Sequence, residues 1–254
     1  MTVVAAADRF RADYAAHRAS EGRAHKGAEL RSLPYLRSGP LARQWAVRAR
    51  SFEALMKIVV RPMAKRANGP VQMLDLGAGN GWLSYRLARE GHRCTAIDIR
   101  EDDIDGLGAA EELRRIVHFA RLTASFEALP LPDRSADLAV FNASLHYATD
   151  LPTAMAEAAR CVRSGGCIAI VDSPFYGDSA DGEAMVREKR LAPGLAALDC
   201  IEFLTRDRLE DASGIAWRRH RVRYPLWYEL RPLMARLRGT RLPSRFDLWT
   251  AELP

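Results

Sequence analysis

Apolar runs of strand length alternate with segments of helical periodicity through the middle of the chain. The apolar runs predict strands at residues 71–76, 93–98, 116–123, 136–142 and 166–172. The segments between them predict helices at residues 81–90, 103–114 and 151–163. Strands that alternate with helices in this way are typical of a parallel sheet with helices on both faces. The pattern therefore predicts an α/β fold.

The hydrophobic pattern changes on either side of this region. Before it, apolar residues between Leu41 and Val59 recur near helical spacing, and Pro62 is expected to end that helix. After Pro174, the pattern predicts helices at 178–191, 205–211 and 227–237, and strands at 215–224 and 246–252. Thr205 is expected to cap the second of these helices.

This organisation predicts two parts of unequal size. Residues 1–69 are expected to form an N-terminal helical extension that acts as a lid. Residues 70–254 are expected to form one ligand-binding domain, with its substrate-side elements mostly within 175–245. Gly22 and Gly27 are expected to interrupt the extension before its long helix.

Three glycines follow the first predicted strand at alternate positions. Gly77, Gly79 and Gly81 lie between the apolar run that ends at Leu76 and the helical segment that begins at Trp82. Glycine lets a backbone turn sharply and approach a ligand closely, and the next helix presents free N–H groups. A dinucleotide fingerprint would have its third glycine one residue later. The spacing therefore predicts a binding turn for a ligand other than a dinucleotide, with a purely structural turn as the alternative.

An acidic residue, Asp98, ends the next predicted strand. Folds of this type hold ribose hydroxyls with an acid about 20 residues beyond the glycines. One carboxylate can accept two O–H bonds, which suits a vicinal diol. Asp98 is therefore the predicted ribose ligand, and a solvated acid at a strand end is the alternative.

The order of strand, Asp-x-Gly-x-Gly-x-Gly, helix, strand and acid resembles the start of class I S-adenosylmethionine-dependent methyltransferases. Later segments are similar to the group that includes ubiquinone and menaquinone C-methyltransferases, with a methyltransferase type 11 domain. They are FEALPLPD at 126–133, ADLAVFNASLHY at 136–147 and VRSGGCIAIVD at 162–172. Ser164 stands where this group usually has proline. The resemblance implies a Rossmann-like, seven-stranded, mostly parallel sheet whose last strand is antiparallel.

The resemblance also implies a cofactor, S-adenosyl-L-methionine, which is released as S-adenosyl-L-homocysteine. The residues predicted to contact it are Asp75, Gly77, Ala78, Gly79, Asp98, Ile99, Ser125, Phe126, Asn142 and Arg48. Ser125 stands where the family usually has an acid that contacts the adenine amino group. Phe126 is expected either to cover a face of adenine or to belong to the core.

Candidate catalytic residues lie just beyond the predicted strand ends, because ligands bind at that edge of an open sheet. His146 is the first candidate for a general base, and Tyr147 is the second. Asp172 and Tyr176 are weaker candidates. A structural hydrogen-bonding role is the alternative for His146.

Composition limits the other possibilities. The chain has 254 residues, 48% of them hydrophobic, and a net charge of +6 carried almost entirely by arginine. We therefore do not expect a nucleic-acid partner from the charge alone. Cys94, Cys161, Cys167 and Cys200 show no metal-binding spacing, so no metal site and a cytoplasmic location are expected. No apolar run reaches 18 residues, so no membrane insertion is expected.

The sequence as a whole predicts an enzyme that methylates a small-molecule acceptor by in-line transfer from S-adenosylmethionine. An RNA-directed methyltransferase and a non-catalytic cofactor-binding protein are the alternatives. Neither the acceptor, nor the methylated atom, nor the oligomeric state follows from the sequence.

Overall fold

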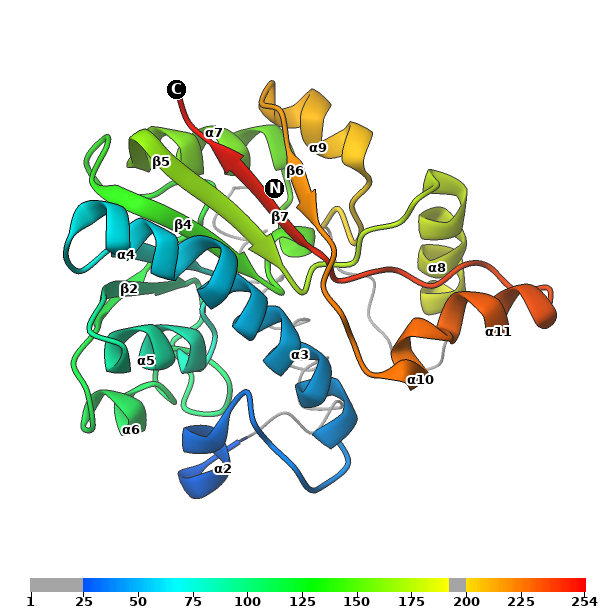
Figure 1. Ribbon diagram of the computed structural model, residues 1–254, viewed down its shortest axis with the longest axis horizontal. Helices are drawn as coiled ribbons and strands as arrows, with labels where there is room; N and C mark the ends of the chain where they lie inside the picture. Colours follow the sequence, from blue (N-terminus) through cyan, green and yellow to red (C-terminus); the bar gives the residue numbers. More distant parts are fainter. Residues whose placement is uncertain (1–24, 192–199) are drawn as a thin grey trace, which may run out of the picture.

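A seven-stranded sheet forms the centre of the computed structural model, which describes residues 25–191 and 200–254 (Figure 1). The strands are β1 (Gln72–Leu76), β2 (Arg93–Asp98), β3 (Ala120–Thr123), β4 (Ala136–Asn142), β5 (Val162–Val171), β6 (Arg218–His220) and β7 (Leu248–Glu252). Their order in the sheet is β3-β2-β1-β4-β5-β7-β6. The pairs among β1 to β5 are parallel, and β7 is antiparallel to both of its neighbours. The predicted Rossmann-like sheet with an antiparallel last strand is confirmed.

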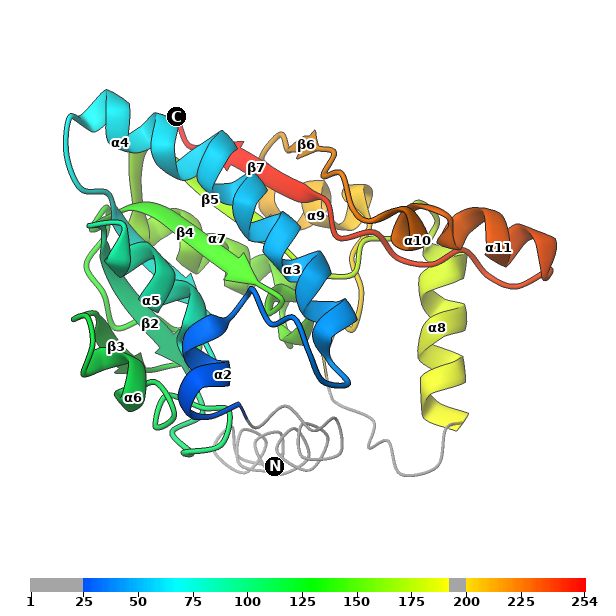
Figure 2. The ribbon, with the colours of Figure 1, turned by 60° about the horizontal axis from the view of Figure 1, so that its bottom comes forward.

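Helices cover both faces of the sheet (Figures 1 and 2). One face carries α3 (Ala42–Leu55), the π-helix η1 (Met56–Val60), α4 (Arg61–Ala67) and α5 (Trp82–Arg89). The other carries α7 (Leu151–Cys161) and α9 (Arg206–Ser213). The remaining helices are α2 (Gly27–Ser32), α6 (Glu111–Arg114), η2 (Leu145–Tyr147), α8 (Ser179–Leu191), α10 (Leu226–Glu229) and α11 (Arg231–Leu237).

The central strands divide their side chains between two apolar clusters. In β4, Leu138 and Val140 join the cluster under α3 and α5, whereas Ala139 and Phe141 join the cluster under α7. Alternate residues of a strand point to opposite faces, so a strand covered on both sides is apolar throughout. This accounts for the continuous apolar runs, and β2 and β4 have the predicted bounds of 93–98 and 136–142.

The long N-terminal helix does not end at Pro62, contrary to the prediction. Helix α3 continues through η1 into α4, where Pro62 lies in the first turn, and the end comes at Asn68 with a φ of 49°. The π-turn of η1 changes the hydrogen-bond register just before Pro62, which lets the helix pass through it.

Other elements are shorter than predicted. The helix expected at 103–114 is confined to α6, since residues 101–110 form turns, and a β-carbon on Gly108 would lie 2.6 Å from the Glu101 carbonyl oxygen. The strand expected at 215–224 is only the three residues of β6. The predicted cap is confirmed, because the Thr205 side chain accepts a hydrogen bond from Arg208 N at 3.2 Å.

The helical part of the N-terminal segment packs in the same apolar cluster as the sheet. Leu55 and Val60 are fully buried there, together with residues of β1, β4 and β5. Residues 1–24 of the predicted extension lie outside the described residues. The division into a lid at 1–69 and a domain at 70–254 stays a prediction.

Candidate functional site

The glycine turn after β1 has a backbone that other residues rarely adopt. Gly77, Gly79 and Gly81 have φ angles of 76°, 54° and 73°. A β-carbon on Gly77 would lie 2.4 Å from the β-carbon of Ser144, whose hydroxyl donates to the Leu76 carbonyl. The Ala78 N–H donates to the Ile97 carbonyl at 2.9 Å, which ties the turn to β2. The turn thus depends on glycine both for its dihedral angles and for its contact with Ser144.

Asp98 lies beside this turn, at the end of β2. Its Oδ2 accepts a hydrogen bond from Gly79 N at 2.7 Å, and its Oδ1 accepts one from Arg100 N at 2.9 Å. Burial raises the pKa of the Asp98 carboxyl, and these two backbone N–H groups oppose the rise. A carboxylate oxygen accepts more than one hydrogen bond, so both oxygens retain acceptor capacity for hydroxyl groups.

Two buried oxygens without a protein partner lie near the ends of β1 and β4. They are Asp75 Oδ1 and Asn142 Oδ1. The other oxygen of Asp75 accepts hydrogen bonds from the backbone N and the hydroxyl of Ser84, at 3.2 and 2.8 Å. Burial raises the pKa of Asp75 to about 7. Buried acceptors normally have partners, so these two oxygens fit a ligand that carries N–H or O–H groups.

Ile99, Ser125 and Phe126 follow β2 and β3 and are half-buried. Phe126 packs edge-to-face on Phe141, with ring centroids 5.5 Å apart, and a β-carbon on Gly77 would lie 3.6 Å from its ring. Ser125 Oγ accepts a hydrogen bond from Glu127 N at 3.1 Å, which makes it a turn residue as well as a candidate ligand. The fold therefore brings Phe126 to the glycine turn.

A second polar cluster lies at the end of β5, under helix α3. Asp172 has a φ of 55°, and its Oδ1 accepts a hydrogen bond from the buried Ser51 hydroxyl at 2.5 Å. The Ser51 hydroxyl also lies 2.9 Å from the Tyr224 hydroxyl. Asp172 Oδ2 is buried and has no protein partner. Burial raises the pKa of Asp172, and the positive charge of Arg48 opposes that rise.

Two of the arginines of α3, Arg48 and Arg50, lie in different environments. Arg48 is half-buried, and its guanidinium lies 5.0 Å from the centre of the Trp45 ring. Arg48 precedes Ser51 by three positions, so the two side chains lie on the same side of α3, and Ser51 contacts Asp172 at the end of β5. Arg50 is exposed and pairs with Glu53 at 3.0 Å. Arg48 is thus the arginine of this pair that faces the candidate site.

The predicted catalytic residues form a short helix, η2, after β4. His146 Nδ1 lies 3.5 Å from the Ser173 hydroxyl, and the rings of His146 and Tyr147 are 4.1 Å apart. Because Ser173 follows Asp172, His146 lies at the same edge of the sheet as the Asp172 cluster. Tyr176 is further along, and its hydroxyl accepts a hydrogen bond from Arg241 at 3.4 Å.

Sequence reasoning missed Ser51 and Tyr224 as site residues. Ser51 follows Val47 by four positions and precedes Leu55 by four, so helical spacing alone would have placed it on the buried face of α3. A buried serine in an apolar helix face was the available signal. Tyr224 had no such signal, since only the fold brings it to Ser51.

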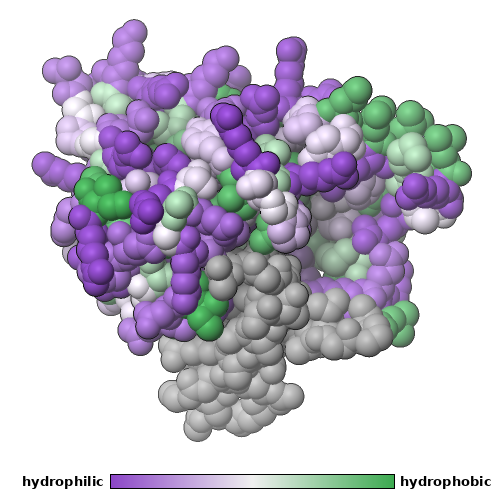
Figure 3. Space-filling view, turned by 90° about the horizontal axis from the view of Figure 1, so that it is seen from below, coloured by the Kyte–Doolittle hydropathy of each residue, from purple (hydrophilic) through white to green (hydrophobic). Residues whose placement is uncertain are grey.

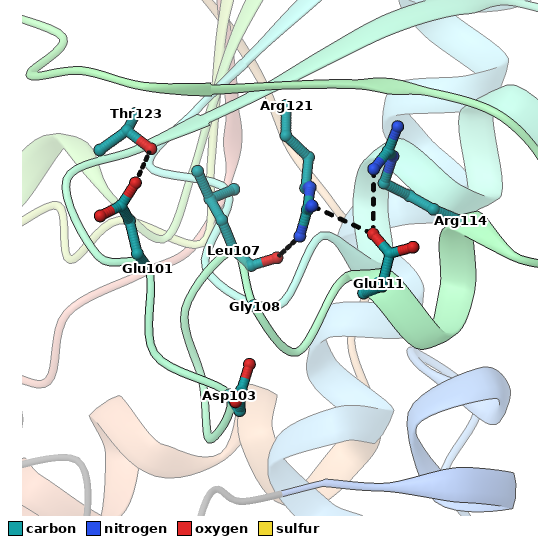
Figure 4. Close-up of a pocket in the computed structure, with 8 residues that line it drawn as sticks. All are labelled: Glu101, Asp103, Leu107, Gly108, Glu111, Arg114, Arg121 and Thr123. Carbon is teal, nitrogen blue, oxygen red and sulfur yellow. Dashed lines mark hydrogen bonds and ion pairs between the residues drawn. The ribbon is translucent and has the colours of Figure 1, made fainter.

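A separate hollow of about 550 Å³ lies beside β3 (Figure 4). Several of its charged groups are already engaged: Arg121 and Arg114 both lie 3.0 Å from Glu111, and Glu101 accepts from Thr123 at 2.7 Å. None of the predicted cofactor residues lines it. Across residues 25–191 and 200–254, no group of three or more metal-ligating side chains is gathered. Within the same residues, no helix has the length and hydrophobicity needed to span a membrane.

Comparison with known proteins identifies the central region. Residues 74–170 match the family model described as a methyltransferase domain. The chain is 34% identical over 97 residues to malonyl-[acyl-carrier protein] O-methyltransferase of Serratia marcescens, covering 38% of this chain and 36% of that protein. It is 36% identical over 115 residues to dimethylglycine N-methyltransferase of Parasynechococcus marenigrum, covering 43% of this chain and 39% of that protein. The chain thus aligns with well under half the length of these two relatives.

Solved structures share the fold over most of the chain. Geranyl diphosphate C-methyltransferase of Streptomyces coelicolor A3(2), solved with Mg²⁺, geranyl diphosphate and S-adenosyl-L-homocysteine, has a TM-score of 0.59 at 16% identity. That match covers 85% of this chain and 87% of the other. The [4+2]-cyclase SpnF has a TM-score of 0.55 at 18% identity, covering 83% and 82%.

Residues 74–170 therefore carry the methyltransferase domain of the class I S-adenosylmethionine-dependent methyltransferases, as the motifs predicted. The methyl donor of this family is S-adenosyl-L-methionine. The contacts of the individual residues with that cofactor stay predictions.

Proposed function

We propose that this protein transfers a methyl group from S-adenosyl-L-methionine to a small-molecule acceptor. The observation that carries the proposal is the hydrogen bond between Asp98 and Gly79 N, which joins the predicted ribose ligand to the glycine turn. This pairing places a hydroxyl-binding carboxylate beside a backbone that a ligand can approach closely. Such a pair suits a nucleoside bound at the carboxyl edge of the sheet.

In this proposal, residues around the turn hold the cofactor. Asp98 binds the ribose hydroxyls, Ile99 and Phe126 lie against the two faces of adenine, and Ser125 accepts from the adenine amino group. Gly77, Ala78 and Gly79 leave space for the methionine end of the cofactor. The unpartnered oxygens of Asp75 and Asn142 offer hydrogen-bond acceptors for the ammonium group at that end.

The Asp172 cluster is the proposed acceptor side. When bound, the cofactor supplies a methyl group on a positively charged sulfur. The lone pair of an acceptor atom bonds to that methyl carbon, and the sulfur leaves with the electrons of the carbon–sulfur bond. Catalysis then rests mainly on positioning, with a base where the acceptor carries a proton. Asp172 Oδ2 is buried without a partner, so it is a candidate base alongside His146 and Tyr147.

Charge favours an acceptor with an anionic group. The substrates in the names of the relatives and of the solved structure, malonyl-[acyl-carrier protein], dimethylglycine and geranyl diphosphate, carry a carboxylate or a diphosphate. Arg48 is half-buried near Asp172, and an arginine can bind such a group with two parallel hydrogen bonds. RNA is less favoured, because the end of β4 and the two residues after it are Phe141-Asn142-Ala143-Ser144 rather than the N/D-P-P-Y/F signature of base amino methylation.

The test is transfer of a labelled methyl group from S-adenosylmethionine. The purified protein is incubated with the labelled donor and with either the small-molecule fraction or the RNA of an extract of its native organism. We expect a labelled small molecule that mass spectrometry identifies, and less label from the Asp98→Ala variant when the cofactor concentration is limiting. Label only in RNA would contradict the small-molecule proposal. Cofactor binding without label in either fraction would support the non-catalytic alternative.

A further inference from the structure

A projecting arm connects β6 to β7 and carries exposed apolar side chains. It consists of helices α10 and α11, which extend away from the body of the molecule (Figures 1 and 2). Its large exposed apolar residues are Leu226, Trp227, Leu230, Leu233, Met234 and Leu237. We refer to these six residues as the apolar stripe, because successive members are separated by one or three positions.

The apolar stripe lies on the outer side of the arm. Leu226 and Leu237 are 73% and 74% exposed, whereas Tyr228 and Ala235 of the same helices are buried. The arm thus has an inner face packed on the protein and an outer face that is also apolar. Figure 3 shows apolar residues gathered at the arm, next to strongly polar ones. Contiguous exposed apolar surface of this kind usually marks an interaction site.

The arm is also strongly basic. Residues 225–245 contain a single acid, Glu229, and the arginines Arg231, Arg236, Arg238, Arg241 and Arg245. Glu229 is itself paired with Arg245 at 3.4 Å and with Arg221 at 3.6 Å. A hollow of about 640 Å³ beside the apolar stripe is lined by four arginines, Arg43, Arg231, Arg238 and Arg241, together with Trp227 and Met234. Its lining also includes one acid, Glu188, which pairs with Arg241 at 2.8 Å. Apolar and cationic side chains are therefore adjacent along the whole arm.

We propose that the arm docks this protein on the surface of an anionic lipid bilayer. Leucine and tryptophan side chains of an amphipathic helix bury themselves at the boundary between headgroups and acyl chains, while arginines meet the lipid phosphates. The charge of the arm is complementary to an anionic surface. Because the arm is convex and projects, a bilayer receives it without the matching groove that a folded protein partner would need.

The position of the arm relates docking to the candidate site. Strand β6 is antiparallel to β7, which is antiparallel to β5, so β6 and β5 end at the same edge of the sheet. The arm leaves β6 at that edge, and Asp172 follows β5 there. Docking through the apolar stripe therefore turns the edge with the candidate site toward the bilayer. The inference itself does not depend on methyl transfer.

The test is flotation of the full chain with vesicles. One set contains phosphatidylcholine alone, and the other also contains phosphatidylglycerol as a third of the lipid. We expect co-flotation with the anionic vesicles only, weakened by high salt because salt screens the arginine–phosphate attraction. Leu233→Glu and Leu237→Glu should each lower vesicle binding at least about tenfold, since each removes one buried leucine and adds a repelled charge.

Matched controls lie at the far end of the molecule, beside α6. Ile116 is 51% exposed, similar to Leu233 at 52%, so Ile116→Glu makes the same change in charge and hydropathy away from the arm. Arg236→Gln and Arg238→Gln should each weaken flotation with the anionic vesicles, because each removes a cation that meets lipid phosphate. Arg115→Gln is their control. We expect both controls to bind vesicles as the wild type does, and thermal melts to show that all variants fold.

Several results would overturn the proposal. The first is no flotation with anionic vesicles, and the second is equal loss of binding in Ile116→Glu and Leu233→Glu. A third is that sedimentation reveals a dimer that Leu233→Glu dissociates while vesicle binding is unchanged, which would assign the apolar stripe to a second copy of this chain. Vesicle binding without methyl transfer would leave this proposal standing and count only against the proposed function.

Discussion

The buried hydroxyl of Ser51 donates a hydrogen bond to Asp172 Oδ1 at 2.5 Å, across 121 positions of sequence. This bond joins the middle of α3 to the end of β5, and it leaves Asp172 Oδ2 without a protein partner. The Ser51 hydroxyl also lies 2.9 Å from the hydroxyl of Tyr224, which comes from the segment before α10. The N-terminal helix therefore contributes directly to the candidate acceptor side.

The first prediction concerns Asp172. If Asp172 is the base among the candidates, Asp172→Asn should lower kcat for methyl transfer by about 10²-fold or more, because an amide cannot take up the acceptor's proton. The affinity for S-adenosylhomocysteine should change less than about threefold, because Asp172 lies on the acceptor side. Asp178→Asn is the control, since Asp178 is exposed and asparagine caps α8 as aspartate does. An equal loss of cofactor affinity and kcat would refute this division of roles.

The second prediction concerns Asp75 and pH. Burial raises the pKa of Asp75 from 3.8 to about 7, so the folded state holds a proton that the unfolded state has released between those values. This group therefore makes the free energy of unfolding fall as pH rises through that window. Asp75→Asn removes this titration. The free energy of unfolding of the wild type should therefore fall relative to that of the variant as pH rises. Urea unfolding of both proteins across this pH range measures that difference. A difference that does not change with pH would contradict the prediction.

The third prediction concerns Gly77 and separates the cost of its backbone conformation from the cost of its contact with Ser144. Gly77→Ala combines a φ of 76° with an overlap on Ser144, whereas Gly91→Ala has a φ of 88° and open space around its new β-carbon. The backbone cost is of order 1–3 kcal/mol in both. We expect Gly77→Ala to lower the free energy of unfolding clearly more than Gly91→Ala, and to abolish cofactor binding. Equal losses would show that the contact with Ser144 is not limiting.

The fourth prediction tests the N-terminal lid. If residues 30–62 close over the cofactor, S-adenosylhomocysteine should raise the protection of their amides against hydrogen exchange. Lids that exclude water from a reaction behave in this way. Unchanged protection would instead assign this segment to the permanent helical layer, in keeping with the buried positions of Leu55 and Val60.

The sequence predicted the sheet well because its strands are buried on both faces. Such strands are continuous apolar runs bounded by turn residues, so β4 was located to the residue. The helix expected at 103–114 failed because tight turns at Gly106 and Gly108 override helical spacing. The Ser51–Asp172–Tyr224 cluster was out of reach because its members come from three distant segments. Local sequence patterns predict the helices and strands, whereas tertiary packing determines which polar side chains come into contact.

Calorimetric titration with S-adenosylhomocysteine tests the central claim most directly. The full-length wild type should bind it more tightly than it binds a nicotinamide dinucleotide. Asp98→Ala should lose about 1–3 kcal/mol of binding free energy, because ribose hydroxyls would lose their acceptor. The matched control, Asp103→Ala, removes an exposed carboxylate of the next loop and should bind as the wild type does. Equal affinity in the wild type and Asp98→Ala, or tighter binding of the dinucleotide, would contradict the account.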